Sequence, residues 1–454
     1  MTAAASIIAP LVDRGLGNTS YLVDLGDGRA LVLDPSRHPG PYLELAERRG
    51  LTVAYTVETH LHADFVSGSR ELAALDAEVV APAGAGLQFP ARGLGDGDEL
   101  DLGGLTLRAL ATPGHTPEHL SYLLRDGDRP LALFSGGSLL VGAVARTDLI
   151  DPDRTEDLAR QLWRSLHERV LGLPDDLAVY PTHGAGSFCS APAGADRVTT
   201  IGREKRTNPL LAAGSEDAFV ERLLEGLGTY PPYFLRLRDV NRRGPVVYGP
   251  GPAALPGLSV DEVLRLSAEG AFVIDVRPID RFGAGHLPGS VSIALRDAFA
   301  TWLGWLVPDD VPLVFVLDAD QDVDRVVREA RKVGYERLAG ALGGGTGAWA
   351  AAGHRLDRIG LADAAGAEGA IVDVRQRSEF DTGHIPGAIH AELGAMASLG
   401  AAIPSGPISV MCGHGERAMS AASLLTAGGR HDVTVLTGGP DRWSAAREVA
   451  LVSE

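Results

Sequence analysis

The sequence predicts an α/β protein made of a larger layered N-terminal domain followed by two smaller α/β domains that resemble each other. Over about the first 250 residues, short β-rich segments alternate with helical ones. The linker-like segment YGPGPAALPG follows at residues 248–257. After it, IDVRPIDRFGAGHLPGS at residues 274–290 returns as VDVRQRSEFDTGHIPGA at residues 372–388. A repeat of this length indicates two copies of one domain.

The elements of the first domain follow from local patterns of apolar residues and turn residues. They are a hairpin at 21–35, a helix at 41–50, a strand at 52–59, a second hairpin at 121–136, a helix at 154–170 and a strand at 176–184. With the linker and the repeat, they place the domain boundaries at 1–250, 255–356 and 358–454.

Composition limits the classes of function. The net charge of −18 and the absence of long basic runs disfavour nucleic-acid binding. No apolar stretch is long enough for a membrane span, and the first ten residues do not resemble a secretory signal. The chain has two cysteines, Cys189 and Cys412, which gives no disulfide framework. We therefore expect a cytoplasmic protein.

The second copy contains a loop suited to a reactive cysteine. The apolar run PISVM leads into the loop, and a helical stretch, AMSAASLLT, follows it. The loop residues are Cys412, Gly413, His414, Gly415, Glu416 and Arg417. A strand, a loop and a helix in this order direct backbone N–H groups at one central atom. Together with Arg417, these groups favour a thiolate at Cys412, which is the nucleophilic form.

This copy resembles the rhodanese family in its DVR, GHIPGA, cysteine-loop and GGPDRW motifs. The resemblance implies that Cys412 accepts a sulfane sulfur as a persulfide and passes it to a thiol, sulfite or cyanide. Phosphatases of related shape have five residues between cysteine and arginine, whereas this loop has four. The alternative is a buried structural cysteine.

The first copy lacks the reactive groups. Alignment of PLVFVLDADQDVD with PISVMCGHGERAM places Leu317 opposite Cys412 and Asp322 opposite Arg417. A loop without a thiol or a cation does not activate sulfur, so this copy is predicted to be catalytically silent, with a role in packing and positioning. Its aspartates lack the glycine and glutamate of a calcium-binding EF-hand loop.

Histidines at predicted strand ends indicate a metal site in the first domain. THLHAD supplies His60, His62 and Asp64, while TPGHT supplies His115 and YPTHG supplies His183. Two histidines at i and i+2, joined by remote ones, can converge on one cation. We expect His119 to be a surface residue or a neighbour of the ligands.

At these motifs the chain resembles the metallo-β-lactamase fold, an αββα sandwich, and within it the persulfide dioxygenases fused to rhodanese domains. FSGGSLLVGAVARTDL, THGAGSFC and TIGREKRTNP also occur in family order. The resemblance implies oxidation of small persulfides by O₂ at a mononuclear iron held by two histidines, matched by His60 and His115, and one aspartate. In this chain Gly137 stands where that aspartate is expected, and Phe65 replaces the last histidine of H-x-H-x-D-H.

Three interpretations of this centre stay open. His60, His62 and His115 together bind Fe²⁺ or Zn²⁺; two histidines hold iron weakly; or the domain binds no metal and serves as a scaffold. A dinuclear hydrolase is disfavoured, because both the bridging carboxylate and the second-site histidine are missing. Cys189 is either a persulfide carrier near this centre or a small buried apolar residue.

The leading hypothesis is an enzyme of sulfur metabolism, with persulfides such as glutathione persulfide, sulfite and thiosulfate as substrates or products. One alternative is a sulfurtransferase with a metal-free first domain, and another is a non-catalytic persulfide carrier or sensor. The resemblance also implies a homo-oligomer.

Overall fold

The fold is described from a computed structural model that covers residues 6–189, 196–398 and 403–453. The chain divides into two compact units. The first runs up to Pro252 and takes in Ala330–Gly334, while the second contains the other residues from Ala253 onwards. Within the described ranges, no helix has the length and apolar character needed to cross a membrane.

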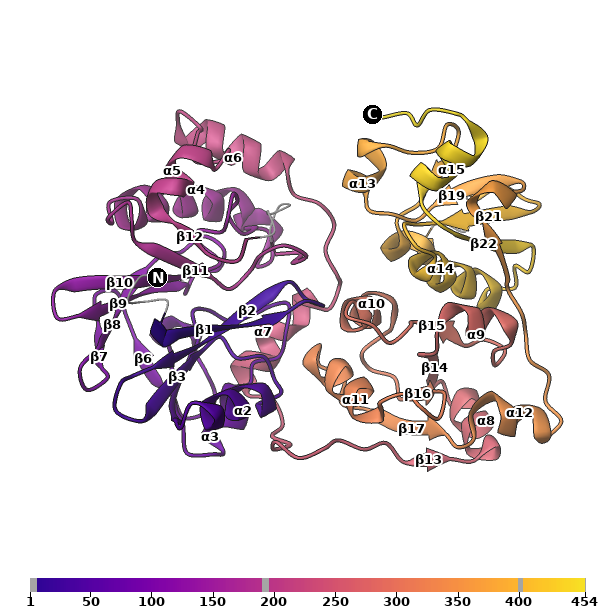
Figure 1. Cartoon of the computed structure of the whole chain (residues 1–454), viewed down its shortest axis with the longest axis horizontal. Coiled ribbons are helices and arrows are strands. Elements are labelled where there is room, and N and C mark those ends of the chain that lie inside the picture. The colour runs from indigo at the N-terminus through magenta and orange to yellow at the C-terminus, as the bar shows by residue number, and fades with distance from the viewer. Residues whose placement is uncertain (1–5, 190–195, 399–402, 454) are drawn as a thin grey trace. The chain divides into compact units, whose positions relative to one another are not determined.

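The first unit contains two six-stranded sheets (Figure 1). One sheet has the order β1(Ile8–Asp13), β2(Asn18–Asp24), β3(Arg29–Leu33), β4(Thr52–Val57), β5(Glu78–Pro82) and β6(Arg92–Leu94). The other has the order β12(Thr199–Thr200), β11(Ala178–Pro181), β10(Arg129–Gly136), β9(Leu120–Asp126), β8(Thr106–Ala111) and β7(Glu99–Asp101). The two hairpins expected from the sequence are the antiparallel pairs β2–β3 and β9–β10.

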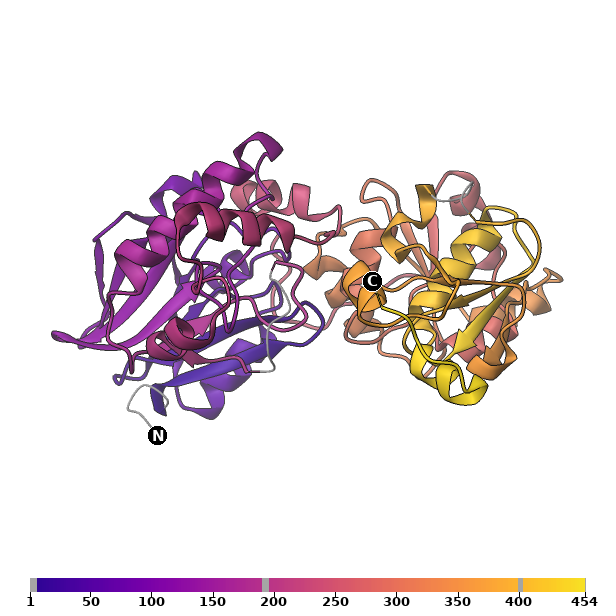
Figure 2. The same ribbon diagram turned by 90° about the horizontal axis from the view of Figure 1, so that it is seen from above.

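Helices cover the outer face of each sheet, which gives four layers (Figure 1; Figure 2). They are α2(Gly40–Arg48) and α3(Ser69–Ala73) on the first sheet and α4(Thr155–Ser165), α5(Ile201–Thr207) and α6(Glu216–Glu225) on the second, with α7(Phe234–Arg243) after them. Between the sheets lies a buried core that includes Tyr21, Leu31, Tyr122 and Phe134. Apolar residues therefore face inwards from both sheets, as a sandwich of two sheets requires.

The second unit holds two five-stranded parallel sheets with the same topology. The first has the order β13(Gly257–Leu258), β17(Leu338–Leu342), β16(Leu313–Val316), β14(Phe272–Asp275) and β15(Val291–Ser292). The second has the order β18(Gly360–Asp363), β22(Val433–Thr437), β21(Ile408–Met411), β19(Ala370–Asp373) and β20(Ile389–His390). Their helices are α8(Val260–Ala268), α9(Ile279–Ala284), α10(Phe299–Leu306), α11(Val323–Lys332) and α12(Gly345–Ala351), then α13(Arg377–Thr382), α14(Glu416–Ala427) and α15(Pro440–Arg447).

The DVR motif of each copy has a structural role. Asp373 at the end of β19 is buried and binds Arg375 through both carboxylate oxygens, and Arg375 also donates to the carbonyl of Gly383. Asp275 and Arg277 make the same pair in the other copy. Because the silent copy keeps this ion pair, the motif secures the fold rather than the chemistry.

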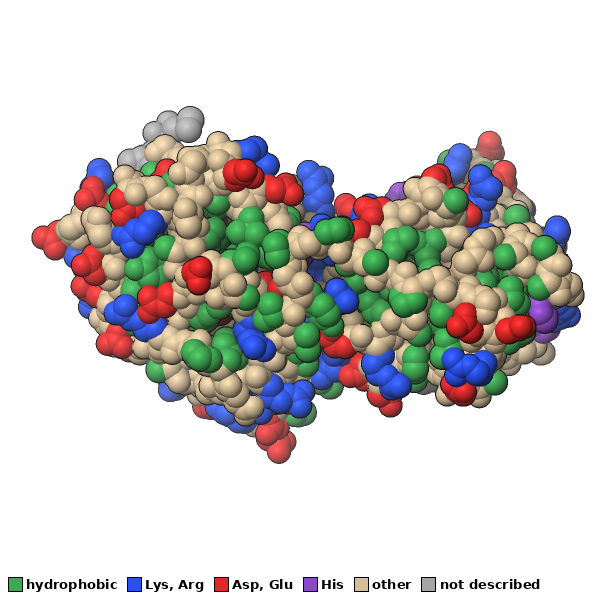
Figure 3. Space-filling view, turned by 90° about the horizontal axis from the view of Figure 1, so that it is seen from below, with side chains coloured by type: hydrophobic (Ala, Val, Ile, Leu, Met, Phe, Trp, Pro, Cys, Tyr) green, Lys and Arg blue, Asp and Glu red, His purple; other side chains and the backbone are tan. Residues whose placement is uncertain are grey.

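Charged side chains are mixed on the surface of the first unit. On the face drawn in Figure 3, acidic and basic groups of this unit are interspersed rather than gathered by sign.

Candidate functional site

Three histidines converge at the ends of strands in the first unit. His60 follows β4, His115 follows β8 and His183 follows β11, and all three are buried. One ring nitrogen of each lies within 4.8 Å of those of the other two. We call these residues the three-histidine group.

Hydrogen bonds fix the tautomer of each member. His115 Nδ1 donates to the carbonyl of Arg146 over 2.6 Å. His60 Nδ1 lies 2.8 Å from Thr59 Oγ1, whose own proton goes to Asp34, so Nδ1 is the donor. Each ring therefore carries its proton on Nδ1, which leaves a lone pair on Nε2.

His183 also carries its proton on Nδ1. Its Nδ1 lies 2.9 Å from Asn18 Oδ1, while Asn18 Nδ2 donates to Asp64 over 2.7 Å. The Nε2 atoms of His183 and His60 are 3.4 Å apart. Two nitrogens bound to one ion at 2.0–2.1 Å with a tetrahedral angle lie about 3.4 Å from each other.

The protonation of His60 and His115 suits metal binding. Burial, together with the neighbouring histidines, holds the pKa of His60 well below its usual range. Burial and His183 do the same for the pKa of His115. Neutral imidazoles whose lone pairs face one another form the donor set of a divalent cation, and their outward Nδ1 bonds are those that orient metal-bound histidines. The residues present therefore fit a metal ion.

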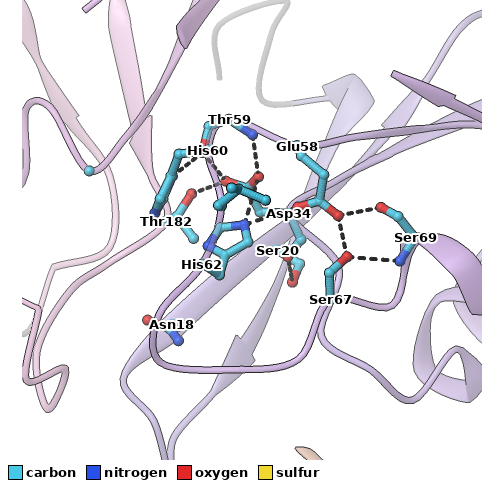
Figure 4. Close-up of polar contacts among 12 residues, drawn as sticks. Asn18, Ser20, Asp34, Glu58, Thr59, His60, His62, Ser67, Ser69 and Thr182 are labelled. Carbon is cyan, nitrogen blue, oxygen red and sulfur yellow. Dashed lines mark hydrogen bonds and ion pairs between the residues drawn. The ribbon is translucent and has the colours of Figure 1, made fainter. Parts of the chain in front are cut away.

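His62 has a different environment from the one expected. Its Nε2 donates to Glu58 over 3.0 Å and lies 3.2 Å from an Asp34 oxygen (Figure 4). Burial opposes the charged form, but these two carboxylates raise the pKa of His62 to about 10. Among the possible ligands that the sequence suggested, His183 lies close to His60 and His115, and it also lies close to His62 and Asp64 in a second group of potential ligand atoms.

Asp34 and Glu58 are buried residues that the sequence analysis did not single out. Asp34 accepts hydrogen bonds from the Thr59 N–H over 2.7 Å and from the hydroxyls of Thr59 and Thr182. Glu58 accepts from the hydroxyls of Ser67 and Ser69 (Figure 4). Donors on both sides make these carboxylates a hydrogen-bonded support for the His60 loop. The signal in the sequence is that each acid directly follows a buried strand.

Phe65 and Gly137, the two departures from the family pattern, each have a packing partner. The ring of Phe65 stacks on His62 with centroids 4.2 Å apart. At Gly137, an added Cβ would lie 2.4 Å from Cδ2 of His115. The His115 ring therefore occupies the space that a side chain at residue 137 would need.

His119 and Cys189 are also buried beside this group. His119 Nε2 accepts from the Gly137 N–H over 2.9 Å and its Nδ1 bonds Thr112, so neither nitrogen is left for a metal. His119 is thus a neighbour of the ligands, not a surface residue. Burial and the Asp64 carboxylate raise the pKa of the Cys189 thiol well above its usual range, which favours the thiol over the thiolate.

A carboxylate at residue 137 is expected to harm the site. Gly137→Asp would push His115 away, because the new Cβ overlaps its ring. We expect lower metal content and a loss of about 1–3 kcal/mol in the free energy of unfolding. Gly172→Asp is the matched control, since a Cβ there meets nothing within 4 Å. Metal analysis and thermal unfolding check this, and a rise in metal content would contradict it.

The second unit places Cys412 at the carboxyl end of β21, a central strand of its sheet. The thiol is buried, and its Sγ accepts the Gly415 N–H over 3.1 Å. Gly415 has φ +109°, a value that side-chain-bearing residues rarely adopt, and α14 begins directly after it. The Gly415 N–H of the loop therefore faces the sulfur, whereas Arg417, which the sequence placed beside the thiol, bonds Glu379.

The equivalent loop of the silent copy is closed by its own side chains. Leu317 is buried at the end of β16. Gln321 accepts the Asp318 N–H over 2.9 Å and donates to the carbonyl of Val276 over 2.9 Å. The amide of Gln321 thus bonds the backbone on both sides of this loop.

The silent copy also contacts the helix that follows the Cys412 loop. Ser292 on β15 accepts the hydroxyl of Ser420 over 2.6 Å and donates its N–H to Ser423 over 3.0 Å. Ile279 Cδ1 lies 2.9 Å from the position of a Cβ added to Gly415. The first copy is thus in direct contact with α14 and with the residue before it.

Comparisons with known proteins match both units. Residues 13–183 match the metallo-beta-lactamase superfamily, and residues 259–352 and 360–446 match the rhodanese-like domain. The mitochondrial persulfide dioxygenase ETHE1 of Homo sapiens is 31% identical over 202 residues, which cover 44% of this chain and 73% of that protein.

Two further proteins are similar to this chain. A hydroxyacylglutathione hydrolase of Methylococcus capsulatus is 36% identical over 37% of this chain and 62% of its own length. A crystal structure described as a metallo-beta-lactamase from Staphylococcus aureus is 29% identical, with a TM-score of 0.67 over 74% of this chain and 98% of that one.

Proposed function

Because the chain belongs to the persulfide dioxygenase family of the metallo-β-lactamase superfamily and carries two rhodanese-like domains, we propose that it acts on sulfane sulfur at two centres, Cys412 and the three-histidine group. The family and fold class predicted from the sequence are confirmed. The combination of domains fits a protein of sulfur metabolism.

The reaction at Cys412 is sulfur transfer. The Cys412 thiolate attacks the outer sulfur of a donor, the S–S bond of the donor breaks, and the donor leaves as a thiolate or sulfite. An acceptor thiol, sulfite or cyanide then attacks the terminal sulfur of the enzyme persulfide, which restores the Cys412 thiolate. The Gly415 N–H bonded to Sγ supports this assignment most directly, because it stabilises negative charge on the sulfur in both steps.

Kinetics test this reaction. A covalent sulfur intermediate requires the donor to leave before the acceptor reacts, so thiosulfate and cyanide should give parallel double-reciprocal lines. Thiocyanate is the measured product. Intersecting lines, or no thiocyanate above the uncatalysed rate, would rule the mechanism out.

The reaction at the three-histidine group is the oxidation of a small persulfide. The observation that supports this reaction is the convergence of three unprotonated Nε2 atoms. Those of His60 and His183 are 3.4 Å apart. A ferrous ion bound there supplies the redox chemistry by which dioxygen and water convert the sulfane sulfur to sulfite, with release of the carrier thiol and two protons. His60, His115 and His183 would hold the ion, and their Nδ1 bonds to Thr59, Arg146 and Asn18 orient the rings.

Metal analysis separates this proposal from a scaffold domain. We expect chain purified anaerobically after iron supplementation to retain close to one iron per chain and to consume oxygen with glutathione persulfide. Zinc in place of iron, without oxygen uptake, would contradict the oxidation. A chain with no metal would leave Cys412 as the reactive centre and support the sulfurtransferase-only alternative.

A further inference from the structure

The positively charged residue of the Cys412 loop, Arg417, forms an ion pair with the carboxylate of Glu379. The guanidinium of Arg417 donates to Glu379 through both terminal nitrogens, over 2.5 Å and 2.8 Å. Only 16% of the Arg417 side chain is exposed, against 41% of Glu379. A two-point bond of this kind fixes both groups and offsets the positive charge of the loop.

Glu379 is held in this position from its own helix. It lies in the first turn of α13, where its carboxylate also accepts the Gln376 N–H over 3.2 Å in a capping box. Burial opposes ionisation, but Arg417 lowers the pKa of Glu379 below its usual value. The carboxylate is therefore both ionised and fixed at neutral pH.

The pair lies within electrostatic reach of the sulfur. Arg417 Nη2 is 4.0 Å from the position of a Cβ added to Gly413, the residue after Cys412. Burial opposes the charged form of Arg417, but Glu379 first and the Cys412 sulfur after it raise the pKa of Arg417. An anionic donor that approaches Cys412 thus meets an arginine whose charge is already balanced.

The fold does not depend on a negative charge at the position of Glu379 and a positive charge at that of Arg417. The silent copy carries Arg281 at the position of Glu379 and Asp322 at that of Arg417, so both signs are reversed. It forms the same sheet topology. Removal of the Glu379 charge should therefore leave the domain folded.

We propose that Glu379 sets the donor preference of Cys412: it cancels the charge of Arg417, so the loop takes sulfane sulfur faster from persulfides of small thiols than from the thiosulfate dianion, which remains a slower donor. This rests on the proposed sulfurtransferase activity. The Cys412 thiolate attacks the terminal sulfur of R–S–SH, the S–S bond breaks, and R–S⁻ leaves with the bond's electron pair. The SH proton stays on the new Cys412 persulfide until the medium takes it.

The test measures how fast each donor loads sulfur onto Cys412, by rapid quench and mass spectrometry. The donors are thiosulfate, with two negative charges, and cysteamine persulfide, whose carrier ends in an ammonium group. Glu379→Gln keeps the capping box, because glutamine also serves at that position. We expect it to raise the loading rate with thiosulfate about tenfold and to leave that with cysteamine persulfide unchanged or lower.

Two control variants accompany the test. Glu379→Asp keeps the charge and should keep the wild-type ratio of the two rates. Asp381→Asn removes an equal charge from the same helix, where Asp381 pairs with Arg377, and should also keep it.

The outcomes separate this inference from the activity on which it rests. Wild-type chain that loads sulfur from neither donor would overturn the sulfurtransferase proposal. Wild-type loading, combined with a Glu379→Gln variant that changes both rates by the same factor or neither rate, would overturn the role of Glu379 alone. Unchanged far-UV circular dichroism and thermal unfolding establish that each variant is folded.

Discussion

Cys412→Ser is expected to lower the rate of sulfur transfer from thiosulfate to cyanide at least about a thousandfold. A serine hydroxyl is not ionised at neutral pH and forms no persulfide, so both half-reactions are lost. The Gly415 N–H remains in place and cannot compensate. The measurement is thiocyanate formation under saturating donor.

Cys189→Ser is the matched control, because Cys189 is the only other cysteine in the chain. It is buried in the first unit beside Asp64, and burial keeps it as a thiol. The Cys189 variant should retain the wild-type rate of thiocyanate formation. Loss of activity in this variant, with retention in Cys412→Ser, would move the nucleophile to the first unit.

His183→Gln is expected to remove most of the bound metal. Loss of one of three ligands should weaken binding by more than the roughly 10–100-fold typical of changes just outside the ligand shell. Iron content after dialysis and a metal titration of the apoprotein measure this directly, without reference to activity.

His62→Gln is the informative counterpart. His62 bonds Glu58 and Asp34 instead of joining the three-histidine group, and a glutamine amide can donate to the same carboxylates. This variant should keep its metal and lose some thermal stability. Metal loss in His62→Gln together with retention in His183→Gln would restore the set of His60, His62 and His115.

Much of the fold could be predicted because its signals are local or repeated. The hairpins around Gly26 and Gly127 follow from apolar runs flanking glycine–aspartate turns. The repeat around Asp275 and Asp373 predicted two similar domains, and their sheets have the same strand order. Cys412 could be located because strand, loop and helix are consecutive in sequence.

The metal centre could be predicted only in part, since its geometry depends on contacts between distant segments. Sequence spacing favours His62 as the partner of His60, but Asp34, 28 positions earlier in the chain, and Glu58 hold His62 as a cation. His183 reaches His60 because β11 pairs with β10 and Asn18 fixes its ring. The pairing of Glu379 with Arg417 is equally invisible in the sequence, as the two residues come from separate helices.

The central claim is that Cys412 carries the sulfur. The most direct measurement is to expose the wild-type chain to cysteamine persulfide, remove excess donor, alkylate, digest and locate the added sulfur by mass spectrometry. We predict close to one sulfur atom per chain on the peptide that contains Cys412, released as thiocyanate when cyanide is added before alkylation. Added sulfur on the Cys189 peptide, or on neither peptide, would contradict the claim.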